Sequence, residues 1–356
     1  MIILNQFPPP SGVYRYAYDI QSAVKESSLF TFLYGSPQRD IPSYAPGHYI
    51  QGKFKSLKVL NKILPNLSHA QFINEINKTV DSQTILHYAS PMVPLKIASL
   101  PKVVTFHDPP SVLLNTDMFF GNSSSPSIGH SLQKKFQARY YDHFKKFDNV
   151  LAVSEYVKFA LIESGFAGNI KVIYPCISDS FKLLAEKRAL KEKLGLPLDK
   201  ICVLSVSTRL RKKNLSMVKK TMEILGEKFK LVRIGPSIMT DDISITNIDY
   251  EKVNMVYNAS DVLLFPSLYE GFGYPLVEAF ATGLPAVTSD IEIFRETSGN
   301  AALLADPNDA QTLASAVKEA VNNSETLIRK GLERSKRFSF HRFTKNINEY
   351  YQSVLS

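Results

Sequence analysis

Apolar runs with the length of buried strands alternate with stretches of helical periodicity along most of the chain. In the first part, the strand-like runs are residues 2–4, 29–33, 84–86, 103–106, 150–153 and 171–173, and the helical stretches are residues 13–24, 132–147 and 155–164. In the second part, strand-like residues 201–206, 230–234, 261–265, 286–288 and 301–304 alternate with helical residues 215–225, 250–259, 275–282 and 310–322. Strands that alternate with helices predict βαβ units and a parallel sheet.

The two sets are separated by residues 175–198, where a charged helical stretch is followed by Gly195 and Pro197. A chain of 356 residues is also long enough for two domains. We therefore expect an α/β fold of two Rossmann-like, doubly wound domains that face each other across a cleft. In this interpretation residues 1–175 form the first domain, residues 176–335 the second, and residues 336–356 a final helix.

Composition and charge narrow the class of protein only slightly. A hydrophobic fraction of 44% supports two cores, and a formal net charge of +9 favours anionic ligands or surfaces. Because the charge is spread along the chain and no nucleic-acid motif is visible, we expect no nucleic-acid partner. Cys176 and Cys202 fit two buried thiols better than a disulfide or a metal site. Since no signal peptide or membrane span is visible, we expect a cytoplasmic protein.

Residues 265–290 contain the highest concentration of candidate functional residues. Gly271 and Gly273 allow a tight loop after an apolar strand, and Pro275 fits the first turn of the helix that follows. A helix N-terminus at the carboxyl end of a strand is a favourable place for phosphate or another anion. Two carboxylates flank the loop, because Glu270 precedes it and Glu278 lies within the helix.

A basic turn follows the strand at residues 201–206. It contains Arg209, Lys212 and Lys213, and a cationic turn at the end of a parallel strand can bind a diphosphate. A solvated basic turn is the plain structural alternative for an isolated cluster of this kind. The glutamate-containing loop downstream favours the binding interpretation.

Residues 265–290 resemble the Glu-x7-Glu segment of retaining glycosyltransferases with the two-domain GT-B fold, specifically family 4 (glycosyl transferases group 1). Four further regions resemble that family in the same order along the chain: a glycine loop at residues 11–17, a histidine strand at residues 103–108, the end of the first domain at residues 152–156 and 172–175, and the basic turn at residues 206–214. Ordered matches of this kind are more specific than any single motif. The resemblance implies that the final helix crosses back to the first domain.

The resemblance also implies roles for the charged residues of the second domain. Lys213 would bind the diphosphate of a nucleotide-sugar donor, with Arg209 or Lys212 as the second cation. Glu278 would accept hydrogen bonds from the two ribose hydroxyls, and Glu270 would contact the donor sugar near the reacting centre. The plain alternative for both glutamates is a helix-capping or solvated carboxylate.

Uncharged groups would complete the donor site. The resemblance implies donor contacts from the segment Gly271, Phe272, Gly273 and Tyr274. In the first domain, Gly12 would let a loop approach the diphosphate, and His107 would touch the donor sugar. An ordinary turn glycine and a structural histidine are the alternatives for these two residues.

The implied reaction is the transfer of a hexose from a GDP- or UDP-linked sugar to a glycan, glycolipid or lipid-linked oligosaccharide, with retention of the anomeric configuration. No Asp-x-Asp motif is present, so we expect a metal-independent enzyme without a cofactor, in which cations and a helix dipole stabilise the leaving group. Two other interpretations remain open: a GT-B epimerase or phosphorylase, and a non-catalytic nucleotide-sugar-binding protein.

Three stretches outside these motifs have features of their own. From Lys53 to Leu64, lysines and leucines occupy different faces of a predicted helix, which fits either a surface helix on the first-domain core or peripheral contact with anionic membrane. Residues 109–130 read as a long loop rich in proline and serine. Residues 235–249 are shorter than the region that helps to hold the nucleotide base in most members of the family, which leaves the base open.

Overall fold

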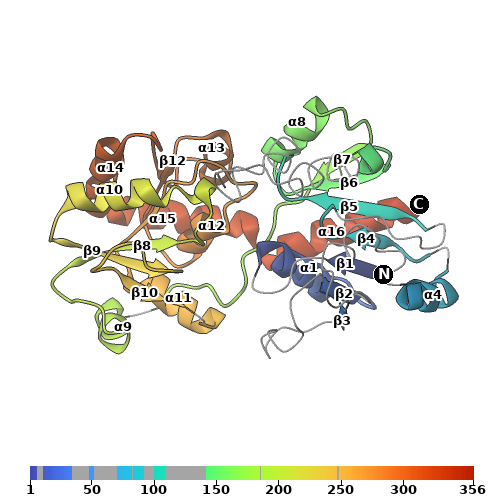
Figure 1. Ribbon diagram of the computed structural model, residues 1–356, viewed down its shortest axis with the longest axis horizontal. Helices are drawn as coiled ribbons and strands as arrows, with labels where there is room; N and C mark the ends of the chain where they lie inside the picture. Colours follow the sequence, from blue (N-terminus) through green and yellow to red (C-terminus); the bar gives the residue numbers. More distant parts are fainter. Residues whose placement is uncertain are drawn as a thin grey trace, which may run out of the picture. The chain divides into compact units, whose positions relative to one another are not determined.

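The structure is a computed structural model that describes residues 1–5, 11–33, 48–51, 70–81, 83–91, 100–109, 142–184, 186–246 and 248–356. These residues form two compact units (Figure 1). The first unit contains the described residues up to Cys176 together with Phe340–Ser356, and the second contains Ile177–Ser339. The chain therefore passes between units after Cys176 and again after Ser339, where the sequence predicts limits after residues 175 and 335.

A parallel sheet forms the centre of the first unit. Its described strands lie in the order β3 (His48–Gln51), β2 (Ser28–Leu33), β1 (Ile2–Asn5), β4 (Leu86–Tyr88), β5 (Lys102–Phe106), β6 (Asn149–Ala152) and β7 (Asn169–Val172). Ile3 pairs with Leu29 on one side and with His87 on the other. Both faces of this sheet are covered, so that Ile3, Val103 and Val104 are fully buried. The strand order reverses between β1 and β4, as in a doubly wound fold.

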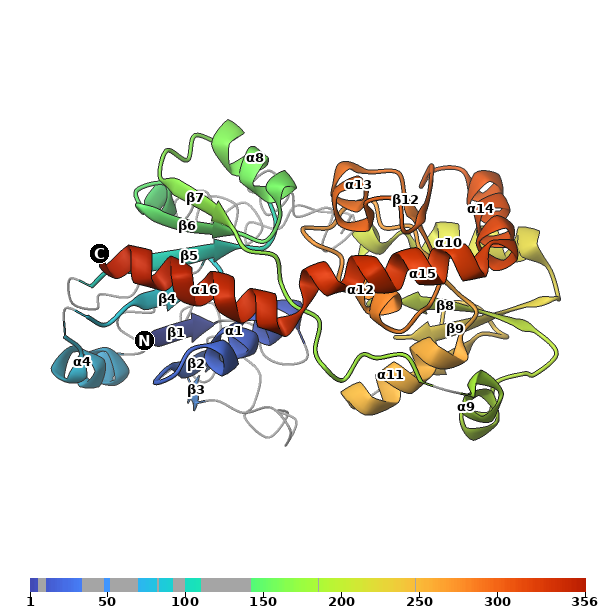
Figure 2. The same ribbon diagram turned by 180° about the vertical axis from the view of Figure 1, so that it is seen from behind.

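Four described helices belong to the first unit: α1 (Gly12–Ala23), α4 (Ala70–Thr79), α8 (Glu155–Glu163) and the C-terminal α16 (Phe340–Leu355). Helix α16 packs on α1 (Figure 2). Asn348 Nδ2 donates a hydrogen bond to the carbonyl oxygen of Ala23 at 3.0 Å, and Tyr351 Oη lies 2.5 Å from Nδ1 of the buried His87. The predicted return of the last helix to the first domain is thus confirmed.

The second unit is also built on a parallel sheet. Its strands lie in the order β10 (Ile243–Ile245), β9 (Phe229–Ile234), β8 (Ile201–Val206), β11 (Val262–Phe265), β12 (Ala286–Ser289) and β13 (Leu303–Ala305). Its helices are α9 (Lys187–Lys193), α10 (Leu215–Leu225), α11 (Tyr250–Ala259), α12 (Tyr274–Ala281), α13 (Glu292–Ser298), α14 (Ala310–Asn322) and α15 (Ser324–Ser335). Helices α10 and α14 pack together over a buried cluster that includes Val203, Val218 and Leu313. The predicted α/β architecture of two doubly wound domains is therefore confirmed for each unit.

Some elements depart from the predicted pattern. Strand β4 covers Leu86–Tyr88, whereas the apolar run suggested residues 84–86. Helix α15 lies just before the final helix and was not predicted from the sequence. It buries only Leu327 and Gly331, so its largely polar sequence gives a weak helical pattern. Phe144, which lies in the helical stretch predicted at residues 132–147, is fully buried.

Two predicted features, the basic stretch from Lys53 to Leu64 and most of the loop at residues 109–130, lie outside the described residues. Within the described residues, no helix is long and apolar enough to cross a bilayer.

Candidate functional site

The second unit brings the two predicted motifs to neighbouring strands. Its strand order reverses between β8 and β11, and ligands of doubly wound folds bind where the strand order reverses, beyond the carboxyl ends of the strands. The basic turn follows β8 and includes a short 3₁₀ helix, Arg211–Lys213, while the glycine loop follows β11 and leads into α12. Leu268 N donates a hydrogen bond to Lys212 O at 2.8 Å, which joins the two loops directly.

Lys213 and Glu270 form an ion pair in which Nζ lies 2.5 Å from Oε1. Their side chains are only 15% and 10% exposed. Burial by itself would raise the pKa of the Glu270 carboxyl, but the charges of Lys213 and Lys212 and the hydrogen bond from Lys213 lower it. Glu270 is therefore an ionised acceptor at neutral pH, and its half-buried partner Lys213 has further N–H donors for an anionic ligand.

The two other cations of the turn lie in different environments. Lys212 is buried, and its Nζ lies 5.5 Å from the centroid of the Tyr269 ring. Arg209 is exposed, and its Nη2 donates a hydrogen bond to Ser237 O at 2.9 Å. Lys212 is thus the cation that acts on Glu270 together with Lys213, whereas Arg209 contacts the loop after β9.

Glu278 lies on α12 and is buried. Its Oε2 accepts a hydrogen bond of 2.7 Å from the hydroxyl of Tyr257, a fully buried residue of α11. This bond fixes one carboxylate oxygen in place. Tyr257 could not be found from the sequence. A tyrosine on the apolar face of a helix gives the same pattern whether it only packs in the core or also orients a carboxylate.

Helix α12 begins at a crowded turn. Gly273 occupies its N-cap with φ of +90°, a conformation that favours glycine, and an added Cβ would lie 2.8 Å from Cε1 of Phe294. Phe272 is buried against Phe338, with ring centroids 5.4 Å apart, so it belongs to the packing of the unit. Gly271 is buried too, whereas Tyr274 is half-buried and opens the helix. The N-terminus of α12, which is the positive end of its dipole, follows Glu270 by four residues along the chain.

The first unit holds the remaining two predicted residues. Gly12 opens α1, whose N-cap is Ser11, with Oγ accepting a hydrogen bond from Tyr14 N at 3.1 Å. His107 follows β5, and its Nε2 donates a hydrogen bond to the carbonyl oxygen of Ala89 at 2.8 Å. Burial lowers the pKa of His107, so the ring is neutral and Nδ1 carries a lone pair that can accept a hydrogen bond.

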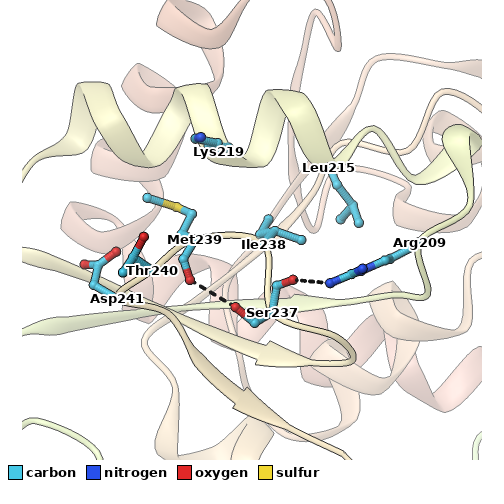
Figure 3. Close-up of a pocket in the computed structure, with 8 residues that line it drawn as sticks. All are labelled: Arg209, Leu215, Lys219, Ser237, Ile238, Met239, Thr240 and Asp241. Atoms are coloured by element: carbon cyan, nitrogen blue, oxygen red, sulfur yellow. Dashed lines mark hydrogen bonds between the residues drawn. The ribbon is translucent and has the colours of Figure 1, made fainter.

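A pocket of about 580 Å³ lies in the second unit (Figure 3). Arg209, Leu215 and Lys219 line one side, and the segment Ser237, Ile238, Met239, Thr240 and Asp241 lines the other. Ser237 Oγ donates to Met239 O at 3.0 Å, so the segment is tied to itself. The pocket walls combine apolar side chains with the cations Arg209 and Lys219 and the carboxylate of Asp241.

In the described part of the chain, no group of three or more His, Cys, Asp or Glu side chains is placed to hold a metal ion.

Comparison with known families decides the class. A sequence model described as "Glycosyl transferases group 1" matches residues 186–338, and one described as "Glycosyltransferase Family 4" matches residues 10–181. The chain belongs to these glycosyltransferases. The first match covers the basic turn, the glycine loop and both glutamates, and the second covers Gly12 and His107.

Solved structures show the same fold. Sucrose-phosphate synthase from Thermosynechococcus elongatus matches with a TM-score of 0.76 and 18% identity, covering 99% of this chain and 98% of that one. The Anabaena protein HepE, solved with UDP and glucose, matches with a TM-score of 0.75 and 17% identity, covering 99% of both chains. These likenesses confirm the GT-B fold predicted from the sequence.

A curated relative is similar over a shorter region. The O-antigen chain mannosyltransferase B of Escherichia coli is 35% identical over 104 residues, which is 28% of this chain and 27% of that protein. The chain therefore matches about a quarter of the length of this relative.

Proposed function

We propose that this glycosyltransferase moves a hexose from a nucleotide sugar to a glycan, glycolipid or lipid-linked oligosaccharide. The observation that carries the proposal is the meeting of Lys213 and Glu270, from the two loops that flank the reversal of strand order in the second unit. Lys213 supplies a cation for the leaving diphosphate. Glu270 supplies a carboxylate for the sugar that is transferred.

The diphosphate is bound by the basic turn and the start of α12 in this proposal. Lys213 is the main ligand, with Lys212 as the second cation because it is buried next to the pair. The N-terminus of α12 adds its dipole, worth about 0.3–1 kcal/mol for an anion near a helix end. Together these groups stabilise negative charge as it develops on the leaving group, which is where a transferase gains most of its rate.

The nucleoside is bound by Glu278 and by the pocket beside Arg209. Tyr257 holds the Glu278 carboxylate, which can then accept hydrogen bonds from two neighbouring ribose hydroxyls. The pocket is large enough for a nucleobase and is partly apolar. Solved structures of HepE with UDP and with UDP-glucose support a uridine nucleotide, while the similarity to a mannosyltransferase keeps a guanosine nucleotide as the other donor to test.

Glu270 contacts the hexose, and the sugar is transferred with retention of its anomeric configuration. We assign no covalent nucleophile among the described residues; the departing phosphate oxygen accepts the proton of the acceptor hydroxyl. The reaction proceeds without a metal ion, because the lysines of the turn and the α12 dipole supply the positive charge.

The acceptor is a growing surface glycan or its lipid carrier. Similarity to an O-antigen chain mannosyltransferase supports this choice. The basic stretch from Lys53 to Leu64 would hold the protein against the inner face of the membrane. Sedimentation with anionic liposomes at low salt tests the contact, and binding unchanged by replacing Lys55, Lys58 and Lys62 with Glu would contradict it.

Mass spectrometry of products tests the proposal as a whole. The protein is incubated with UDP- and GDP-linked hexoses and with simple glycan or polyprenyl-phosphate acceptors. We expect one donor to be consumed and its hexose to appear on an acceptor. Consumption of no donor, or conversion of a donor to its epimer, would overturn the assignment.

A further inference from the structure

Arg233 is a fully buried arginine near the carboxyl end of a strand in the second unit's sheet. It lies on β9, and its side chain has no exposed surface. Among the described residues it forms no ion pair, although a buried cation is costly without compensation. Its hydrogen-bond acceptors are neutral groups, and the charge of the nearby Asp242 carboxylate adds to the compensation.

The guanidinium group contacts four acceptor atoms. Nη1 donates to Ser205 Oγ at 2.9 Å and to Ser207 Oγ at 3.1 Å. Nη2 donates to Ser207 O at 3.0 Å, and Nε and Nη2 both lie 3.3 Å from Pro236 O. Ser205 belongs to β8, whereas Ser207 begins the basic turn and Pro236 begins the segment that lines the pocket. The guanidinium therefore joins the start of both loops.

Two further contacts fix the distance between the first residues of the two loops. Ser207 N donates to Ile234 O at 3.1 Å. Gly235, with φ of +134°, approaches Ser207 so closely that an added Cβ would lie 2.1 Å from Ser207 O. The glycine permits the close approach, and the arginine satisfies the carbonyl groups that the approach buries.

The spacing of the loops sets the shape of the pocket. Arg209, two residues beyond Ser207, donates to Ser237 O, one residue beyond Pro236. Asp242 Oδ2 accepts from Ile238 N at 2.6 Å and from Met239 N at 3.0 Å, which closes the far end of the segment. The residues that line the pocket thus follow directly on Ser207 and Pro236, the two residues that Arg233 joins.

We propose that Arg233 is a positioning residue for donor binding: its guanidinium fixes the basic turn against the segment at residues 236–242 and so shapes the pocket that receives the nucleoside. The inference rests on the proposed function. Lysine cannot replace arginine here, because a single ammonium group cannot reach acceptors on three segments with the planar fork of a guanidinium.

The test compares Arg233→Lys, which keeps the charge, with Gly235→Ala, which keeps the arginine but pushes the two loop starts apart. Ser205→Ala is the matched control, since it removes one acceptor of the same guanidinium without touching either loop. Calorimetry with UDP and with GDP gives nucleotide affinity, and initial rates with the active donor give KM and kcat.

We expect both Arg233→Lys and Gly235→Ala to weaken nucleotide binding about tenfold and to raise the donor KM by a similar factor, with kcat changed much less. Ser205→Ala should bind close to wild type. Because both changes disturb the same contact, the double variant should lose less than the product of the single losses. A general loss of folding would not give this separation of KM from kcat.

The outcomes separate the inference from the proposed function. If wild type binds neither UDP nor GDP, the proposed function fails and the inference falls with it. If wild type binds and Arg233→Lys binds equally well, the inference alone is wrong. If Arg233→Lys fails to fold by circular dichroism, Gly235→Ala decides, and wild-type affinity in that variant overturns the inference.

Discussion

Lys213 and Glu270 are in direct contact, Nζ to Oε1, although 57 positions separate them in the chain. The pair joins a turn after β8 to a loop after β11, and the two strands are neighbours in the sheet. In this ion pair each charge compensates the other. A bound diphosphate would share the ammonium group, and a bound sugar would share the carboxylate.

Lys213→Ala should strongly reduce transfer. Loss of a charged donor to a developing oxyanion costs about 2–4 kcal/mol of transition-state stabilisation, so turnover should fall by about two to three orders of magnitude. Lys220→Ala, which removes an exposed lysine of α10, is the control for lost charge. Initial rates with the active donor provide the measurement, and wild-type turnover in folded Lys213→Ala would remove the assignment.

The fold could be predicted in outline because each buried strand is a nearly continuous apolar run. Val262–Phe265 and Ala286–Ser289 are buried along their whole length, and both were visible in the sequence. The short strand β10 could not be seen, because Ile243–Ile245 lies at the edge of the sheet and is only partly buried. A strand at the edge of a sheet is partly exposed, so it lacks the continuous apolar run from which buried strands are predicted.

The candidate site was predictable where its signal is local. The glycine loop and basic turn stand out as residue patterns, and the structure places Lys212, Lys213 and Glu270 together. Tyr257 and Arg233 carried no such signal, because their roles depend on contacts with Glu278 and with Ser207 that only the folded chain creates. The roles assigned to Lys212, Lys213 and Glu270 stay predictions, as do those of Gly12, His107 and Glu278.

Tyr257→Phe should weaken nucleotide binding while the protein stays folded. The change removes the hydroxyl that donates to Glu278 and leaves the ring in place. A hydrogen bond to a charged group is worth about 1.5–3 kcal/mol, and part of that should appear as lower affinity for UDP or GDP by calorimetry. Tyr350→Phe is the matched control, since it removes a buried tyrosine hydroxyl of α16 that lies in the other unit. Equal affinities for the two variants would contradict the role of Tyr257.

Chelation should leave transfer intact. The lysines of the basic turn and the α12 dipole take the place that a divalent cation holds in metal-dependent transferases. Rates are measured after dialysis against EDTA and again after addition of Mg²⁺ or Mn²⁺. Activity that disappears with EDTA and returns with either ion would show that the metal-independent account is wrong.

Asp19 should make the first unit more stable at acidic pH. Burial raises the pKa of its carboxyl from 3.8 to about 6, against the opposing effects of Arg15 and Cys176. Because the folded pKa lies above the unfolded one, this group opposes folding at neutral pH, and the opposition is lost as the pH falls from above 6 to below 4. Asp19→Asn removes this dependence. Two pKa units correspond to about 3 kcal/mol, so the stability of the variant relative to wild type should be greater at pH 7.5 than at pH 4.5 by up to that amount.

Urea unfolding of Asp19→Asn and wild type at the two pH values gives the comparison. Only the difference between pH values matters, because any contact that the asparagine gains or loses is the same at both. A relative stability that does not change with pH would show that Asp19 ionises normally in the folded protein.

The most direct measurement of the central claim is calorimetry with the nucleoside diphosphate, beside initial rates, on Glu270→Gln and Glu278→Gln. Glu278→Gln should weaken binding of the free nucleotide by about 1–3 kcal/mol, because its carboxylate is assigned to the ribose. Glu270→Gln should bind the free nucleotide at least as tightly as wild type and lose turnover, because its assigned partner is the sugar, which the nucleoside diphosphate lacks, and because the change leaves Lys213 without a competing carboxylate. If both variants bind and turn over like wild type, the two glutamates do not form a donor site, and the account of this chain as a nucleotide-sugar transferase is contradicted.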